Sequence, residues 1–254
     1  MKNKSSTHNL TIGWLYPDLM NTYGDYGNIV VLTKRSQWRN IDVKVLKLSI
    51  GFNPNDLKKC DLLFMGGAQD RQQQIVSSDL SKKSEFLKER IEKSTPGLYI
   101  CGAYQFLGKY YEEPNGNIIK GLEIFDLHTT NQADGKRLIG NIIIKPNIEN
   151  SELLIGFENH GGRTYLGAKT KPLGNVKVGF GNNGEDETEG AIYKESIGTY
   201  LHGPILPKNS WLADRLIKKA IENKYKRTIN LEEIDDSFEI KARNAIAKSL
   251  GIKV

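Results

Sequence analysis

The chain has 254 residues, a net charge of +6, 26% charged residues and 38% hydrophobic residues, which is an ordinary composition for a globular protein. It contains no apolar run near the roughly 20 residues of a membrane helix, no signal-peptide core in its polar first residues, and only two distant cysteines, which argues against a disulfide framework. Basic residues are densest from 208 to 254 but lack the interleaved aromatic residues of nucleic-acid surfaces, so we expect a cytoplasmic protein with no membrane span and no nucleic-acid partner.

The first third of the chain alternates predicted strands with predicted helices. Short apolar runs that end at turn signals predict strands, and segments with apolar residues at helical spacing predict helices. In chain order, strands are predicted at 10–16, 43–48, 61–65 and 98–101, and helices at 28–38, 77–93 and 102–110.

The second half is richer in short strands. These are predicted at 122–127, 137–144, 153–158, 164–166, 176–180, 191–194 and 198–201, with a polar loop at 181–190 and helices at 209–225 and 235–250. Alternating units followed by a strand-rich half predict one α/β domain over residues 10–250, with a mixed, mostly parallel central sheet and helices on both faces. Residues 1–9 are predicted to form a flexible tail.

A cysteine follows the predicted strand at 98–101 and precedes two small residues and a helix. This pattern, Ile100-Cys101-Gly102-Ala103, is typical of a nucleophile elbow, where crowding of the backbone requires small neighbours. The start of the following helix favours a thiolate over a thiol, and the N–H group of Gly102 can point at an oxyanion. A buried structural cysteine is the alternative.

A second candidate feature is the pair Gly66-Gly67 at the end of the predicted strand 61–65. Two glycines at a strand end let the backbone approach a ligand closely, and their N–H groups can complete an oxyanion hole. A plain turn between strand and helix is the alternative. Phosphate binding is a further alternative, but the two common phosphate-loop patterns, GxxxxGK[ST] and GxGxxG, are absent from the sequence.

Two histidines end predicted strands in the second half. His202 precedes a glycine turn, and a histidine at a strand's carboxyl end can deprotonate a cysteine on a neighbouring strand. His160 lies in Glu158-Asn159-His160-Gly161-Gly162 and has three readings: a competing base, a substrate contact, or a residue that hydrogen-bonds its own loop. No His, Cys, Asp or Glu spacing indicates a metal site.

Five segments together resemble a known family: GGAQD at 66–70, ICGAYQFLG at 100–108, FENHGGRTYLG at 157–167, GFGNNGEDETEG at 179–190 and GTYLHGPILPKN at 198–209. The segment that contains Cys101, ICGAYQ at 100–105, resembles the nucleophile motif of class I glutamine amidotransferases, which is usually C-x-G-x-Q. The full set is similar to the cobyric acid synthase type, and most similar to the glutamine amidotransferase subunits of lipid II isoglutaminyl synthases. The resemblance covers residues 10 to about 250 and implies a single class I amidotransferase domain.

The resemblance also implies residue roles. Cys101 is expected to be the nucleophile and His202 the general base, with Gly67 and Gly102 placed for oxyanion stabilisation. Gln105 lies at the motif's glutamine-contact position. An arginine in the strand-rich half is expected to hold the substrate carboxylate, and Arg137 is the best positional match because a guanidinium pairs a carboxylate through two hydrogen bonds.

The family's chemistry implies partners as well. Such subunits hydrolyse L-glutamine to glutamate and ammonia, and they pass the ammonia to a Mur-ligase-like synthetase subunit within a heterodimer. The synthetase uses ATP and amidates D-isoglutamate of lipid II in peptidoglycan synthesis. The chain itself is expected to need no cofactor and no metal. The polar loop at 181–190 and the basic C-terminal helices are candidate docking surfaces.

Two departures from the family pattern affect the site. Ala103 replaces the motif's second glycine, which adds one methyl group to a crowded turn. Pro204 stands where many class I enzymes carry an acid, two residues after the histidine. The pair is therefore either a dyad or is completed by an acid from elsewhere, such as Glu158, Asp18 or the partner chain.

Three other functions remain open at this stage. The acceptor could be a different carboxylate, such as a cobyrinate-like one. The chain could be a non-catalytic scaffold homologue, although the pair Cys101 and His202 argues against this. It could also be a cysteine peptidase or γ-glutamyl hydrolase built on the same elbow.

Overall fold

The structure is a computed structural model that describes residues 8–132, 135–149 and 152–252. Its centre is a six-stranded sheet in the order β13-β14-β4-β3-β1-β2. All neighbouring strands are parallel except β13 and β14, which are antiparallel. The strands are β1 (His8–Leu15), β2 (Ile41–Leu48), β3 (Leu62–Met65), β4 (Gly97–Ile100), β13 (Ala191–Tyr193) and β14 (Ser196–Thr199).

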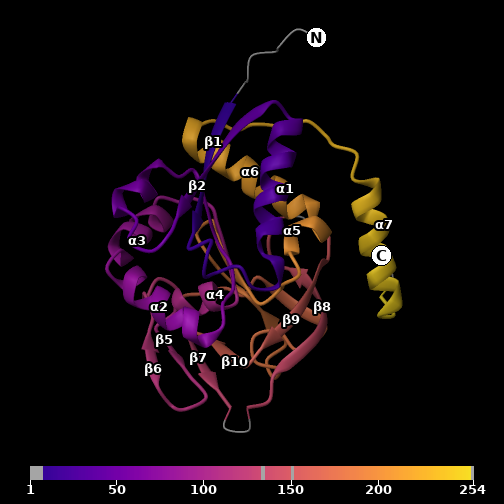
Figure 1. The fold of residues 1–254 in the computed structure, drawn as a ribbon. Coiled ribbons are helices and arrows are strands. Elements are labelled where there is room, and N and C mark those ends of the chain that lie inside the picture. Colours follow the sequence, from indigo (N-terminus) through magenta and orange to yellow (C-terminus); the bar gives the residue numbers. More distant parts are fainter. Residues whose placement is uncertain (1–7, 133–134, 150–151, 253–254) are drawn as a thin grey trace.

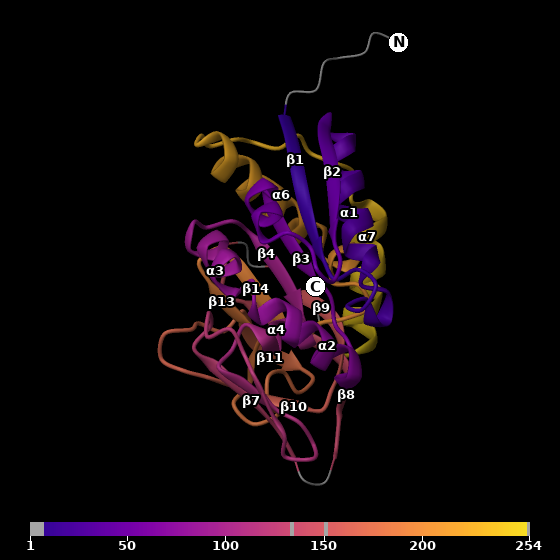
Figure 2. The same cartoon turned by 60° about the vertical axis from the view of Figure 1, so that its left-hand side comes forward.

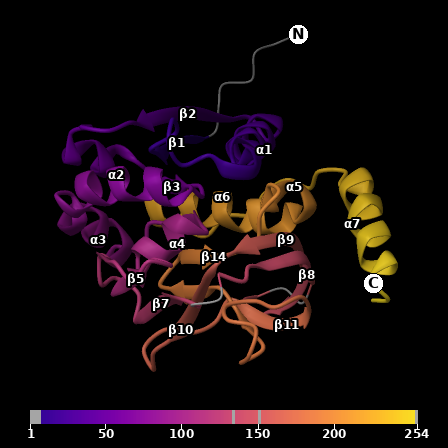
Figure 3. The same cartoon turned by 60° about the horizontal axis from the view of Figure 1, so that its bottom comes forward.

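Helices cover both faces of this sheet (Figure 3). On one face, α1 (Tyr26–Trp38) and α6 (Ser210–Tyr225) bury apolar residues against the strands, with the short α5 (Ile205–Lys208) beside them. On the other face lie α2 (Asp70–Ser81), α3 (Ser84–Glu92) and α4 (Gly102–Phe106). Because both faces are covered, the central strands are apolar throughout: every residue of β3 and β4 is buried. The predicted fold class is confirmed.

Two smaller four-stranded sheets form the lower part of the molecule in Figure 1. One contains β5 (Tyr110–Glu112), β6 (Ile118–Lys120), β7 (Leu127–Asn131) and β10 (Gly162–Leu166). The other contains β8 (Leu138–Pro146), β9 (Leu154–His160), β11 (Gly174–Val178) and β12 (Thr188–Glu189). They lie below the carboxyl ends of the central strands and supply the walls of the site described below.

The last helix, α7 (Ser237–Ser249), lies at the edge of the molecule, where it contacts α5 (Figure 1). The segment before it is held by Arg35, whose guanidinium binds both Asp214 and Asp236. Ala247 packs against Ile143 and Ile155 of the second small sheet. In the described part of the chain, every helix is too short or too polar to cross a membrane.

Several predicted elements differ from the observed ones. The single helix predicted at 77–93 is two helices, α2 and α3, because the chain bends at Lys82–Lys83 and both helices bury their apolar residues in the same core. The strand predicted at 122–127 is wrong. Its backbone N–H groups bind the carbonyls of Phe106 and Leu107 and so terminate α4.

Some boundaries of the predicted elements also moved. The helix predicted at 102–110 ends at Phe106, and the β5–β6 hairpin that follows was not predicted. His8 and Asn9, which were predicted to belong to the tail, open β1 and pair with β2. The rest of the predicted tail, residues 1–7, lies outside the described residues.

Candidate active site

The predicted nucleophile and base are brought together at one edge of the central sheet. β3, β4 and β14 are parallel neighbours, so their carboxyl ends meet there (Figure 2). Gly66 follows β3, Cys101 follows β4, and His202 lies three residues after β14. In open α/β sheets this edge is where ligands bind.

Cys101 has the backbone of a nucleophile elbow. Its φ of 53° and ψ of −108° lie in a region that residues with side chains rarely adopt, between β4 and the start of α4. Such strain costs on the order of 1–3 kcal/mol and persists where the surroundings enforce it. The small neighbours are required, because a Cβ on Gly102 would lie 2.8 Å from the Gln73 side chain. The predicted elbow geometry is confirmed.

Gly67 lies between the two reactive side chains. A methyl group at this position would lie 3.0 Å from Cε1 of His202 and 3.3 Å from Cβ of Cys101. The N–H of Gly67, which we predicted to face an oxyanion, instead donates to Oδ2 of Asp25 at 2.7 Å. If this loop donates a hydrogen bond to an oxyanion, the donor is therefore a backbone amide other than that of Gly67. The N–H groups of the first turn of α4, including that of Gly102, have no partner within the helix.

His202 is buried and its backbone is fixed by β9. Its N–H donates to the carbonyl of Phe157 at 2.7 Å, and its own carbonyl accepts from the N–H of Phe157. Burial lowers the pKa of the imidazole, but the thiolate of Cys101 and the carboxylate of Asp25 outweigh it and raise that pKa to about 10. The protonated imidazolium form of His202 is therefore favoured, which is the form that a thiolate–imidazolium pair contains.

Asp25 is a buried carboxylate beside His202 that the sequence analysis did not consider. It is fully buried just before α1, and its Oδ1 lies 3.8 Å from Nδ1 of His202. That oxygen has no hydrogen-bond partner among the described residues. Pro204, which stands at the usual position of the acid, packs on Gly27 instead, so the start of α1 lies against the histidine turn. A carboxylate thus approaches the histidine from a different element of the fold.

The acids proposed from the sequence have other contacts. Asp18 is exposed and accepts from the hydroxyl of Ser49. Glu158 is buried, but its carboxylate accepts the N–H groups of Phe180 and Gly181. As candidates for the third member of the catalytic group, both are corrected to structural residues.

A cavity of about 480 Å³ opens beside Cys101 and His202. Arg137 lines it and is held in place by Asn159, whose Oδ1 accepts from Nε at 2.8 Å and whose carbonyl accepts from Nη2 at 2.7 Å. Nη1 of Arg137 makes neither of these two bonds to Asn159. The neighbouring Arg163 is buried and binds backbone carbonyls, so it is a structural residue.

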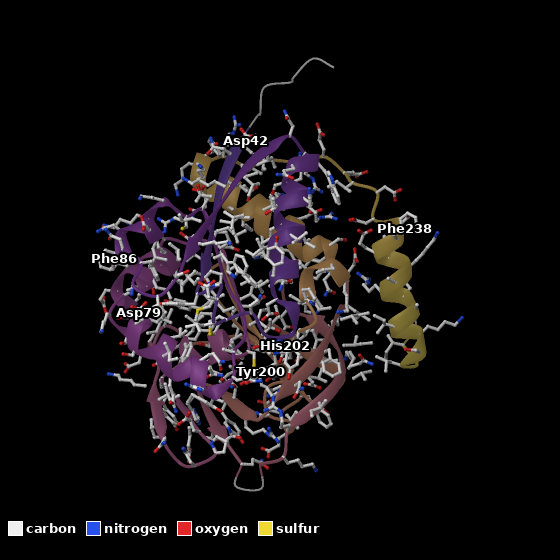
Figure 4. All side chains as sticks on the ribbon, viewed as in Figure 1. Asp42, Asp79, Phe86, Tyr200, His202 and Phe238 are labelled. Atoms are coloured by element: carbon white, nitrogen blue, oxygen red, sulfur yellow. The ribbon has the colours of Figure 1, made fainter. Side chains whose placement is uncertain are left out.

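Gln105 reaches the same cavity from α4. Its Nε2 donates to the hydroxyl of Tyr200 at 3.0 Å, and its Oε1 is buried with no hydrogen-bond partner among the described residues. The ring of His160 stacks on Tyr200 at 3.6 Å, and its Nδ1 bonds to the carbonyl of Gly162 at 2.8 Å. His160 therefore lines the cavity through a packed, anchored ring, which favours the substrate-wall role over the role of base. Figure 4 shows Tyr200 and His202 together at the centre of the molecule.

Removal of the thiolate should lower the pKa of His202 strongly. In Cys101→Ala, burial still opposes the charged ring while the largest favourable contribution is gone, so the pKa should fall well below about 10. NMR titration of the imidazole, assigned with His202→Gln, measures this. A pKa that is the same with and without Cys101 would contradict the ion pair. In the wild type, the acid form of His202 should persist through neutral pH and disappear as pH rises through about 10.

Within the described residues, no three His, Cys, Asp or Glu side chains gather as a metal site. Both cysteines are free.

Comparison with known proteins identifies glutamine amidotransferases as relatives of this chain. A sequence profile for the CobB/CobQ-like glutamine amidotransferase domain matches residues 11–210. The chain is 45% identical over 243 residues to the "lipid II isoglutaminyl synthase (glutamine-hydrolyzing) subunit GatD" of Staphylococcus aureus (strain N315), covering 94% of this chain and 95% of that protein. It is 41% identical to the protein of the same name from Streptococcus pneumoniae, covering 92% and 89%.

More distant relatives carry a different name. A "probable cobyric acid synthase" of Methanothermobacter thermautotrophicus is 27% identical over 217 residues, which is 81% of this chain and 41% of that protein. Among solved structures, a glutamine amidotransferase aligns over 82% of this chain and 98% of its own with a TM-score of 0.54 at 12% identity. Another, from Thermotoga maritima, aligns over 95% and 93% with a TM-score of 0.51 at 15% identity. These structures share the fold.

Proposed function

The chain belongs to the CobB/CobQ-like glutamine amidotransferase family, and from this we propose that it is the glutamine-hydrolysing subunit of a lipid II isoglutaminyl synthase. It hydrolyses L-glutamine to glutamate and ammonia, and a Mur-ligase-like synthetase subunit uses the ammonia to amidate D-isoglutamate of lipid II in peptidoglycan synthesis. The observation that carries the glutaminase activity is the strained Cys101 elbow beside the buried pair of His202 and Asp25, and the 45% identity to the GatD subunit supports lipid II as the acceptor.

The geometry supports a thiolate mechanism. Cys101 attacks the carboxamide carbon of glutamine, and the resulting oxyanion is held by the N–H of Gly102 and by the amide of Ala68, since the amide of Gly67 is bonded to Asp25. His202, already protonated, donates its proton to the leaving ammonia. It then takes a proton from water, which hydrolyses the glutamyl thioester and restores the thiolate.

Arg137 should bind the α-carboxylate of glutamine, so Arg137→Ala should raise KM more than it lowers kcat. Loss of a charge-assisted hydrogen bond is worth about 1.5–3 kcal/mol, or roughly 10- to 150-fold in KM. Steady-state kinetics of glutamate release measure it. L-Glutamine α-amide, which lacks the carboxylate, is the matched control. If Arg137→Ala weakens this analogue as much as it weakens glutamine, then Arg137 does not contact the carboxylate.

The synthetase chemistry belongs to the partner. We propose that the chain uses no cofactor or metal of its own, that ATP is consumed by the partner subunit, and that the heterodimer works in the cytoplasm. The name of the relatives, a "subunit" of a glutamine-hydrolysing synthase, supports a partner that performs the ligation.

The test is nitrogen transfer from glutamine to lipid II. The chain is combined with a Mur-ligase-like synthetase subunit, ATP, lipid II and glutamine labelled with ¹⁵N in its amide, and the product is analysed by mass spectrometry. Transfer of the label into the stem peptide that depends on Cys101 supports the proposal. Glutamate release without labelled product would leave a glutaminase with a different acceptor, such as a cobyrinate-like carboxylate.

A further inference from the structure

Gln73 is a buried polar residue of the cavity to which the reaction above gives no role. It lies in the first turns of α2, its side chain is only 3% exposed, and it lines the cavity together with Cys101 and Gln105. Buried amide side chains are normally hydrogen-bonded on both of their polar atoms. Gln73 is not.

One end of this amide is fixed. Nε2 of Gln73 donates to the carbonyl of Ala68 at 2.9 Å. Because a carbonyl oxygen can only accept, this bond also determines which end of the amide is nitrogen. The other end, Oε1, is buried without a hydrogen-bond partner among the described residues. An unpaired buried acceptor costs about 1–3 kcal/mol, which a ligand that supplies a donor recovers.

The place of this amide in the cavity indicates which part of glutamine lies beside it. The amide of Gln73 packs on Gly102, the residue next to the nucleophile: its Nε2 and Cδ lie 2.8 and 2.9 Å from the place where a Cβ of Gly102 would be. Arg137 approaches the cavity from the strand-rich side instead, where it binds Asn159. The carboxamide carbon must reach the sulfur of Cys101, so Gln73 lies at the carboxamide end of the substrate and Arg137 at the carboxylate end.

We propose that Oε1 of Gln73 accepts a hydrogen bond from the carboxamide N–H₂ of L-glutamine and so selects the amide over the acid. This inference rests on the proposed function, which makes glutamine the substrate and glutamate the product. The product's γ-carboxylate has no N–H donor and carries negative charge, so it meets the carbonyl of Gln73 unfavourably. The same contact therefore favours binding of substrate and release of product.

The test measures equilibrium binding in the Cys101→Ala background, where no turnover occurs. Calorimetry gives the Kd of L-glutamine and of L-glutamate for this protein and for the added change Gln73→Met, which keeps the length of the side chain and removes its hydrogen bonds. The matched control is Gln74→Met on the same helix. Gln74 is exposed, bonds to Glu113 and does not line the cavity.

Selectivity is the ratio of the glutamate Kd to the glutamine Kd. In Gln73→Met we expect it to fall about tenfold, as the loss of one neutral hydrogen bond predicts, because glutamine binds more weakly while glutamate does not. Gln74→Met should leave the ratio unchanged. If Gln73 only supports the loop through Ala68, the Kd values of glutamine and glutamate rise by the same factor, and this outcome overturns the proposal. Kd values that do not change in Gln73→Met overturn it as well.

A second measurement leaves Gln73 intact and does not depend on the folding of a core variant. The γ-methyl ester of L-glutamate is neutral like glutamine but has no N–H donor. It should bind the Cys101→Ala protein about tenfold more weakly than glutamine does, by the loss of the same hydrogen bond. Equal binding would overturn the assignment. The proposed function is tested separately, by Cys101-dependent release of glutamate from glutamine by the otherwise unchanged chain with its partner, so the two failures are distinguishable.

Discussion

Cys101→Ala should reduce glutamate release from L-glutamine to background, a loss of at least about 10³-fold in kcat, because removal of a nucleophile leaves only binding and oxyanion stabilisation. The change removes one sulfur atom at a partly exposed position and should leave the fold intact. The assay is release of glutamate by the purified chain, with and without its synthetase partner. An alanine variant that keeps its activity would end the assignment of Cys101 as nucleophile.

The chain supplies its own control in Cys60. This second cysteine is fully buried, and its thiol donates to the carbonyl oxygen of Asp56 with an Sγ–O distance of 3.4 Å. Burial raises the pKa of the thiol to about 12. Cys60→Ala should therefore keep kcat while losing stability through a small core cavity.

A glutamine-like electrophile should label Cys101 and spare Cys60. With free ammonia in place of glutamine, the complex of Cys101→Ala with its partner should still amidate the acceptor.

Asp25→Asn should lower kcat by about 10²-fold with little change in KM. Asparagine can still accept the N–H of Gly67, but it carries no charge to stabilise the imidazolium of His202. Loss of the acid in a hydrogen-bonded triad costs up to about 10⁴-fold, and the 3.8 Å separation here argues for a smaller effect. Because Asp25 helps to raise the pKa of His202, the alkaline limb of the kcat profile should also move to lower pH.

Asp18→Asn is the matched control for this change. Asp18 lies in the same loop, after β1, but its carboxylate is exposed and bonds to Ser49. Its kinetics should equal those of the wild type. If Asp25→Asn leaves both kcat and the pH profile unchanged, the acid must be absent from this chain's site, and a contribution from the partner subunit becomes the better explanation.

The sequence predicted the main parts of the site because they follow buried strands. Cys101 and His202 each end an apolar run, and the carboxyl ends of parallel strands meet at one edge, so their proximity follows from the fold class. The elbow could be recognised from the sequence because only small residues fit directly after the cysteine. The predicted boundaries were weakest at short elements, such as α4 and β5, where a few residues carry no periodic pattern.

Asp25 could not be chosen from the sequence for a physical reason. It and Asp18 lie seven residues apart in one irregular loop after β1, and nothing in the spacing tells which carboxylate turns inward. The decisive contact is the packing of Pro204 on Gly27, which joins segments far apart in the chain. Gln73 was missed similarly: among three consecutive glutamines, only the register of α2 decides which one is buried against Gly102.

The left-handed backbone of Cys101 means that stability and activity favour different residues at this position. A glycine there would adopt a positive φ without steric cost, and the fold would be more stable by a fraction of the strain that cysteine bears. Selection for thermal robustness alone would therefore tend to erase the nucleophile. A stabilised variant of this protein that came from such a screen should be inspected first at residue 101, because the easiest gain in melting temperature and the loss of function coincide there.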